Sequence, residues 1–256
     1  MAARNKGGAA VKAMRTTLSR AVVEKRAPEK TLSETAAEAL FRGLDYFPTP
    51  PWAARAIAHR VKELDPGSVS VWEPCCGEGH FAEPLREVFG ESRVLASDIY
   101  DYGYGATCDF FHFPFERLTV DWIITNPPFS LGEPFVQRAL IAAQRGVIVL
   151  CRVAFLESVD RYDMLYEGPN RLTTLMPFAE RVPMQLGSWD PDLSSATAYA
   201  AFVFHKGRNA LPPMPFRPGT KRTYWRDTDP ARFAKPAPIP LFENVASAPL
   251  FATGAP

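Results

Sequence analysis

The sequence predicts an α/β fold built on a doubly wound, mostly parallel sheet. Short β-branched and apolar segments alternate with segments of helical character through the middle of the chain. With 256 residues, 46% of them hydrophobic, the chain can bury the core of one domain of good size. The alternation and the length together indicate a single α/β domain, with residues left over for tails.

Helices are expected where a capping residue or a proline precedes a run of good helix formers. Ser33 can cap the first of them, and Thr49 with the prolines around it can open the second. The expected helices cover residues 33–44, 52–64, 81–89 and 133–145.

Strands are expected at the short apolar segments between these helices. Segment 68–72 is β-branched and ends at Glu73-Pro74, and segment 120–125 stops before two prolines that cannot donate to a ladder. The expected strands cover residues 68–72, 94–99, 120–125 and 147–153, and segments 171–176 and 198–204 complete the sheet near its edge.

The two ends of the chain differ from its middle in charge. Residues 1–30 carry a net charge of +6 and residues 206–256 carry +5, which leaves −10 on the residues between them. We expect a disordered basic arm at 1–30, the folded domain at 31–206, and a flexible tail at 207–256 with ten prolines in its last 49 residues. Basic arms on an acidic body suit binding to a polyanion, although simple solvated tails explain them equally well.

Composition also excludes several classes of protein. No apolar run approaches the roughly 18 residues that span a bilayer, and the basic N-terminus lacks the apolar stretch of a secretory signal, so a cytoplasmic protein without membrane contact is expected. The four cysteines include no Cys-x-x-Cys pair and only four histidines accompany them, so neither a disulfide framework nor a metal site is expected.

A glycine-containing turn follows the first expected strand. Its sequence is Glu-Pro-Cys-Cys-Gly-Glu-Gly, with glycines at 77 and 79, and a helix follows. Such a turn lets the backbone approach a ligand and directs helix N-terminal N–H groups at it. The turn lacks the third glycine of the dinucleotide fingerprint and the Gly-Lys-Ser/Thr of a P-loop, so it favours neither NAD nor a nucleoside triphosphate.

Two acidic residues follow at informative positions. Asp98 ends the next expected strand about twenty residues on, where a carboxylate can accept hydrogen bonds from both hydroxyls of a ribose. Asp109 precedes Phe110, so its carboxylate offers an acceptor for an adenine amino group beside aromatic faces. A turn aspartate beside core phenylalanines is an equally good interpretation.

The most specific segment is Asn-Pro-Pro-Phe at 126–129, at the carboxyl end of an expected strand. Open α/β sheets bind their ligands at this edge. A given four-residue string arises by chance in only about one chain of this length in a thousand.

With these motifs the chain resembles the class I S-adenosylmethionine-dependent amino-methyltransferases, over roughly residues 46–205. Within that family it is most similar to the adenine-N6 DNA methyltransferases of the small phage and prophage type. The resemblance implies a Rossmann-like class I methyltransferase fold, S-adenosylmethionine as cofactor and DNA as partner. The implied catalytic residues are Asn126, Pro127, Pro128 and Phe129, and the implied cofactor-binding residues are Phe47, Pro48, Thr49, Glu73, Pro74, Cys75, Gly77, Gly79, Asp98, Asp109 and Phe110.

The chemistry of an amino target explains the motif. The lone pair of an adenine amino nitrogen is delocalised into the ring, so acceptors must hold its hydrogens and draw the nitrogen toward tetrahedral geometry. The side-chain oxygen of Asn126 and the carbonyl of Pro127 suit this role, Pro128 stiffens the loop, and Phe129 can stack on an extruded base. Most of the rate enhancement is expected from alignment rather than from general-base catalysis.

Other readings stay open at this point. Adenine in RNA and the side-chain amide of a protein glutamine pose the same chemical problem, and a binding module without turnover is a non-enzymatic alternative. No separate target-recognition domain is visible, so target choice would come from loops 100–105, 155–170 and 183–197. Cys75 follows a proline, as a cytosine-methylating nucleophile does, but its place in the glycine turn argues against that role. The oligomeric state is not predicted.

Overall fold

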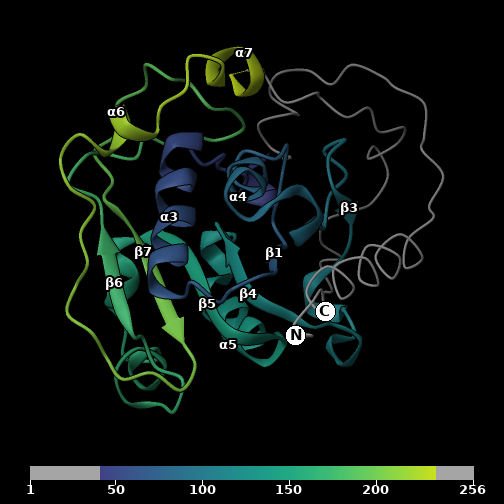
Figure 1. The fold of residues 1–256 in the computed structure, drawn as a ribbon, viewed down its shortest axis with the longest axis vertical. Helices are drawn as coiled ribbons and strands as arrows, with labels where there is room; N and C mark the ends of the chain where they lie inside the picture. The colour runs from purple at the N-terminus through teal and green to yellow at the C-terminus, as the bar shows by residue number, and fades with distance from the viewer. Residues whose placement is uncertain (1–40, 235–256) are drawn as a thin grey trace, which may run out of the picture.

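The computed structural model describes residues 41–234, which form one sheet with helices on both faces (Figure 1). The expected arm 1–30, most of the expected helix 33–44 and residues 235–256 lie outside the described residues. The sheet has seven strands in the order β3-β2-β1-β4-β5-β7-β6. The strands are β1 (Val71–Glu73), β2 (Val94–Asp98), β3 (Ala106–Thr107), β4 (Val120–Thr125), β5 (Ala143–Arg152), β6 (Thr174–Pro177) and β7 (Tyr199–His205).

Strand direction confirms the predicted fold class. Strands β3, β2, β1, β4 and β5 are parallel neighbours, whereas β7 runs antiparallel to both β5 and β6. The order 3-2-1-4-5 is that of a doubly wound sheet, in which the chain starts in the middle and builds outward on each side. The two-residue strand β3 lies in the segment that the sequence left as a connection, because two residues carry no readable periodicity.

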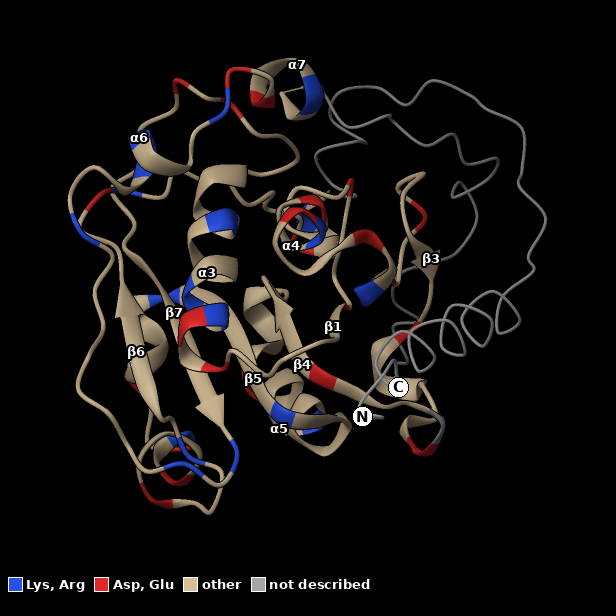
Figure 2. Cartoon of the chain, in the orientation of Figure 1, with Lys and Arg blue, Asp and Glu red and all other residues tan. Residues whose placement is uncertain are grey.

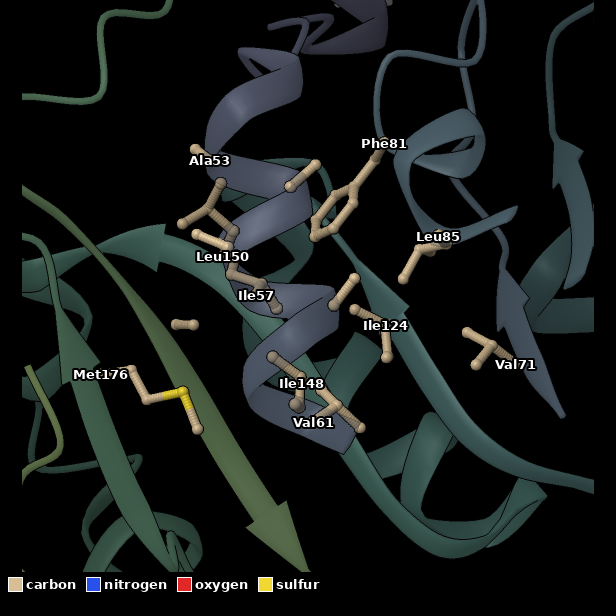
Figure 3. Close-up of a cluster of buried hydrophobic side chains, with 14 of the residues drawn as sticks. Ala53, Ile57, Val61, Val71, Phe81, Leu85, Ile124, Ile148, Leu150 and Met176 are labelled. Atoms are coloured by element: carbon tan, nitrogen blue, oxygen red, sulfur yellow. The ribbon is translucent and has the colours of Figure 1, made fainter. Parts of the chain in front are cut away.

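Side chains on alternate positions of the central strands face two different hydrophobic layers. On β5, Val147 and Val149 pack toward α5, while Ile148 and Leu150 pack toward α3. Figure 3 shows the second layer, where Ile57 and Val61 of α3 lie over Ile148 of the sheet. The helices are α3 (Pro51–Leu64), α4 (Ala82–Phe89), α5 (Gly132–Ala142), α6 (Thr220–Tyr224) and α7 (Asp229–Phe233).

Short helical turns complete the connections. Each 3-10 turn either follows a strand at the carboxyl edge of the sheet or leads into the next strand. The 3-10 turns are Glu91–Arg93, Phe110–His112, Phe115–Arg117, Phe129–Leu131 and Val153–Leu156, and a π-helical turn covers Asp163–Glu167.

The C-terminal part of the described chain packs against the domain, which differs from the expected boundary at residue 206. Asp229, at the start of α7, is 1% exposed and accepts two hydrogen bonds from Arg55 of α3, at 2.7 and 2.9 Å. Arg55 also donates to Glu87 of α4 and to the carbonyl of Tyr224. Residues 207–234 are therefore part of the folded domain, and only 235–256 remain a predicted tail.

Charged side chains of both signs lie interspersed over the described elements (Figure 2). Residues 41–234 contain 20 Lys and Arg against 23 Asp and Glu. Any polyanion that binds this part of the chain must therefore meet locally placed cations rather than a general positive field. None of the helices within residues 41–234 has the length and apolar character needed to cross a membrane.

Candidate active site

A pocket with about 780 Å³ of empty space opens at the carboxyl edge of the sheet, where β1, β2 and β4 end. Strand β1 lies between β2 and β4, so this edge is the point at which successive connections leave in opposite directions. Ten of the predicted site residues line the pocket, namely Phe47, Pro48, Thr49, Pro74, Cys75, Asp98, Asp109, Phe110, Asn126 and Pro128. Five of them do not, namely Glu73, Gly77, Gly79, Pro127 and Phe129.

The glycine turn after β1 forms one wall and requires its glycines. Gly77 and Gly79 have φ angles of +49° and +94°, a region that side chains disfavour. A Cβ on Gly77 would lie 2.5 Å from the ring of Tyr46. The N–H of Gly77 donates to Asp98 at 2.9 Å, so the turn is tied to the end of β2.

Glu73 lies behind this turn rather than in the pocket. It is fully buried, and its Oε1 accepts from the hydroxyl of Thr125 and from the N–H of Cys75. Its Oε2 has no partner among the described residues. Burial raises the pKa of Glu73 to about 8, so the side chain is mostly a neutral carboxylic acid at pH 7. Glu73 therefore supports the turn from below.

Asp98 is the predicted ribose acceptor. It is 9% exposed, and besides Gly77 it accepts from the N–H of Tyr100 at 3.1 Å. Burial raises the pKa of Asp98 to about 6 despite these backbone donors. A carboxylate has about four acceptor positions, and the N–H groups of Gly77, Ile99 and Tyr100 do not fill all of them, so room remains for a ligand hydroxyl.

Asp109 also acts as a cap. It accepts from the N–H of Phe111 at 2.9 Å and pairs with Nδ1 of His112 at 2.6 Å. Burial opposes ionisation, but these donors hold the pKa of Asp109 below its usual value. Phe110 stacks on Phe135, with ring centroids 4.1 Å apart. The turn interpretation of this pair is thus correct locally, and both residues still line the pocket.

Asn126 begins the loop after β4, and its amide orientation is fixed. Its Nδ2 donates to the carbonyl of Phe47 at 2.8 Å and lies 3.6 Å from the sulfur of Met184. A carbonyl only accepts, so the amide nitrogen must face Phe47 and Oδ1 must face away. This Oδ1 is buried without a partner among the described residues.

The segment before α3 meets the loop after β4, as the predicted site requires. The carboxylate of Asp45 accepts from the N–H of Ser130 at 3.0 Å. Thr49 is 2% exposed, and its hydroxyl has no partner within the part of the chain that the structure describes. The segment before α3 and the loop after β4 are therefore in contact beside Asn126. The Thr49 hydroxyl adds a second buried polar atom without a partner among the described residues.

Phe129 lies next to the pocket rather than on its wall. Its ring centroid is 5.3 Å from that of Phe47 and 5.8 Å from that of Tyr199. The guanidinium of Arg152 lies over the ring, 4.7 Å from its centroid. One face of the predicted stacking residue is thus covered by a cation.

Sequence reasoning missed several residues of the pocket. His80 donates from Nε2 to the carbonyl of Phe233 at 3.0 Å, while its Nδ1 has no partner in the described chain. Burial lowers the pKa of His80 to about 4, so the ring is neutral. Ile99, 59% exposed, offers an apolar side chain to the pocket directly after Asp98. Adjacency to the motifs was the available signal for His80 and Ile99, and Met184 lies in the loop 183–197 that was expected to contribute to target choice.

Unsatisfied polar atoms concentrate around this pocket. Within residues 41–234, six buried side-chain nitrogen or oxygen atoms lack a hydrogen-bond partner. Four of them belong to Thr49, Glu73, His80 and Asn126, at or directly behind the wall. Buried polar groups are nearly always paired in proteins, so water or a bound polar group would complete these atoms.

Comparisons with known proteins show similarity at the level of structure only. A scan against protein-family models finds no match, and a search of curated protein sequences finds none either. A protein of Pyrococcus horikoshii considered to be an RNA methyltransferase is 16% identical over 77% of this chain and 98% of its own, with a TM-score of 0.48. The methyltransferase subunit of a type I restriction-modification system from Streptococcus thermophilus is 11% identical over 81% of this chain and 51% of its own, with a TM-score of 0.43.

The plantazolicin methyltransferase BpumL, solved in complex with SAH, is 10% identical over 79% of this chain and 100% of its own, with a TM-score of 0.42. The order and direction of the strands in this chain establish a Rossmann-like doubly wound fold, the fold that the sequence predicted from its resemblance to class I methyltransferases.

Proposed function

We propose that this chain is an S-adenosylmethionine-dependent methyltransferase that methylates the exocyclic N6 amino group of adenine in DNA. The observation that carries the proposal is Asn126, whose amide is held by Phe47 so that a buried, unpartnered oxygen remains beside a large pocket. An acceptor in this position suits a target that brings N–H donors.

The pocket fits the cofactor by the chemistry of its walls. Pro74 and Cys75 of the turn after β1 line the pocket, and the carboxylate of Asp98 offers acceptors for ribose hydroxyls. Phe110 and the exposed Ile99 offer apolar surface to a planar ring. S-adenosylmethionine would supply an electrophilic methyl group on a sulfonium sulfur.

The residues of the loop after β4 would prepare the amino nitrogen. Oδ1 of Asn126 accepts one amino hydrogen, and the carbonyl of Pro127 is the predicted second acceptor. Holding both hydrogens localises the nitrogen lone pair, which turns a poor nucleophile into a usable one. The fixed orientation of Asn126 means that this acceptor needs little reorganisation when the substrate arrives.

The choice of DNA as the substrate rests on the composition of the chain, whereas the choice of an amino target rests on the site. An amino target in DNA is favoured by the basic composition of residues 1–30, because lysine and arginine gain affinity for phosphates by releasing counterions. RNA adenine and a glutamine side-chain amide present the same N–H donors, so both are arms of the test.

The test measures transfer of labelled methyl from S-adenosylmethionine to unmethylated duplex DNA, to RNA and to protein, with identification of the product. Asn126→Ala should reduce the rate by about 100-fold or more, the size of effect seen when a preorganised polar group is removed. Asn209→Ala is the matched control, because it removes the same group from an exposed turn after β7.

The outcomes separate the parts of the proposal. Label recovered as N6-methyladenine from DNA and lost in Asn126→Ala supports it. Label only in RNA or protein replaces the substrate and keeps the amino-methyl chemistry. Cofactor binding without transfer to any of the three overturns the proposed activity.

A further inference from the structure

Arg152 is the last residue of β5 and lies beside the proposed catalytic loop. It pairs in register with Tyr199 at the start of β7, and its side chain is exposed. Its guanidinium lies over the ring of Phe129, 4.7 Å from the ring centroid. A cation therefore covers one face of the ring on which a base is predicted to stack.

Arg152 differs from the arginines of the domain that carboxylates hold in place. Arg55, Arg86 and Arg145 each form ion pairs with one or two carboxylates. Within residues 41–234, no carboxylate forms an ion pair with Arg152. Its charge is available to an anion from outside the chain.

A guanidinium that stayed over Phe129 would disfavour the proposed reaction. Methyl transfer places positive charge on the amino nitrogen, and a guanidinium over Phe129 at that moment would repel it. A cation–π contact at an exposed site is weaker than the stacking of a base on an aromatic ring. An incoming base can therefore displace the guanidinium from Phe129.

We propose that Arg152 leaves Phe129 when the substrate enters and binds a backbone phosphate next to the target adenosine. The inference rests on the proposed function and adds to it a contact between the domain and the backbone of the nucleic acid. Arg152 is a positioning residue in this view, since it holds the nucleic-acid strand and does not touch the reacting atoms.

The test compares Arg152→Gln and Arg152→Lys with the unsubstituted protein. Affinity for an adenine-containing oligonucleotide is measured by fluorescence anisotropy over a series of salt concentrations. Arg152→Gln should bind about tenfold to a hundredfold more weakly at low salt, as for loss of a charged hydrogen bond. The slope of log affinity against log salt should fall by about 0.7 to 0.9, as for one phosphate contact.

Two further readouts separate this role from a structural one. Arg152→Lys keeps the charge and should keep most of the slope, although it loses the planar contact with Phe129. In Arg152→Gln the KM for the oligonucleotide should rise while kcat and the affinity for S-adenosylmethionine change little. Arg60→Gln is the matched control, because Arg60 of α3 also lies over a phenylalanine, Phe216, which is not part of the proposed catalytic loop.

Unchanged oligonucleotide affinity and salt slope in Arg152→Gln, with an active unsubstituted protein, would overturn this inference alone. Equal losses in the Gln and Lys variants would overturn it too, because a packing role would then explain both. No methyl transfer to any nucleic acid by the unsubstituted protein would overturn it together with the proposed function.

Discussion

The domain buries polar side chains in two regions, and the two regions differ in how completely those side chains are paired. Around Arg55, charges from α3, α4 and α7 are joined by short hydrogen bonds, and Asp229 uses both of its oxygens. Around the pocket, Thr49, His80 and Asn126 each keep a buried polar atom without a partner among the described residues.

The difference separates folding from binding. A fully paired buried network holds elements in place. Removing one member leaves its partner's charge buried and unpaired, which costs much folding free energy. An unpaired buried atom weakens the empty domain and gains its partner only from a ligand. Substitutions that remove polar groups should therefore have opposite consequences in the two regions.

The largest effect is expected at Arg55. Arg55→Met leaves Asp229 buried without its cation and should lower the free energy of unfolding by about 3–5 kcal/mol. Urea denaturation measures the loss. Arg60→Met on the same helix removes a partly exposed ion pair with Glu63 and a cation–π contact with Phe216, and should cost within about 1 kcal/mol. Similar losses in the two variants would contradict the view that the network anchors α7.

A smaller effect, with a pH signature, is expected at Asp98. In the unliganded protein its pKa is raised to about 6, while ribose hydroxyls would donate to the carboxylate form. Binding then favours loss of the proton, so cofactor affinity should rise as pH increases from 5 to 7. Asp98→Asn should bind S-adenosylmethionine about tenfold more weakly at pH 7.5 and lose this dependence.

Calorimetric titration across that pH range checks the prediction. Glu78 has a pKa raised to about 6 by burial but lies outside the pocket lining, so Glu78→Gln is the matched control. If Glu78→Gln abolished the pH dependence and Asp98→Asn retained it, the assignment of Asp98 would fail.

The smallest effect has the opposite sign. Thr49→Val removes a buried hydroxyl without a partner and should stabilise the empty domain by up to about 1 kcal/mol while weakening cofactor binding. Thr125→Val removes a hydroxyl that donates to Glu73 and should destabilise the domain by about 1–3 kcal/mol. Thermal unfolding compares them, and a stability loss in both would show that Thr49 is paired in solution.

Much of the fold could be predicted because its central strands are local features of the sequence. The strand ending at Thr125 was predicted from apolar residues stopped by two prolines, and the structure ends β4 there. The packing of α7 could not be predicted, because it depends on Arg55 and Asp229 at positions 174 residues apart. Proline-rich composition also pointed to a tail, and charged residues are usually exposed.

The candidate site shows the same limit. Motifs fixed by their neighbours, such as the glycine turn and the loop after β4, were found in the sequence and meet at one pocket. Contacts supplied by other segments were not found: Met184 approaches Asn126 from the loop between β6 and β7, and Arg152 covers Phe129 from the end of β5. The expected stacking role of Phe129 therefore needs a displacement that no local pattern could reveal.

The contact between His80 and Phe233 has a consequence for the order in which the domain is made. The two residues are separated by 153 positions, and Phe233 follows the last residue of β7 by 28 positions. Closing a longer loop costs more entropy, although the cost grows only slowly with length. At ordinary rates of synthesis the ribosome finishes the sheet about 1–6 seconds before it adds Phe233. A nascent chain thus passes through an interval in which all the strands have been synthesised but Phe233, the hydrogen-bond partner of His80, has not.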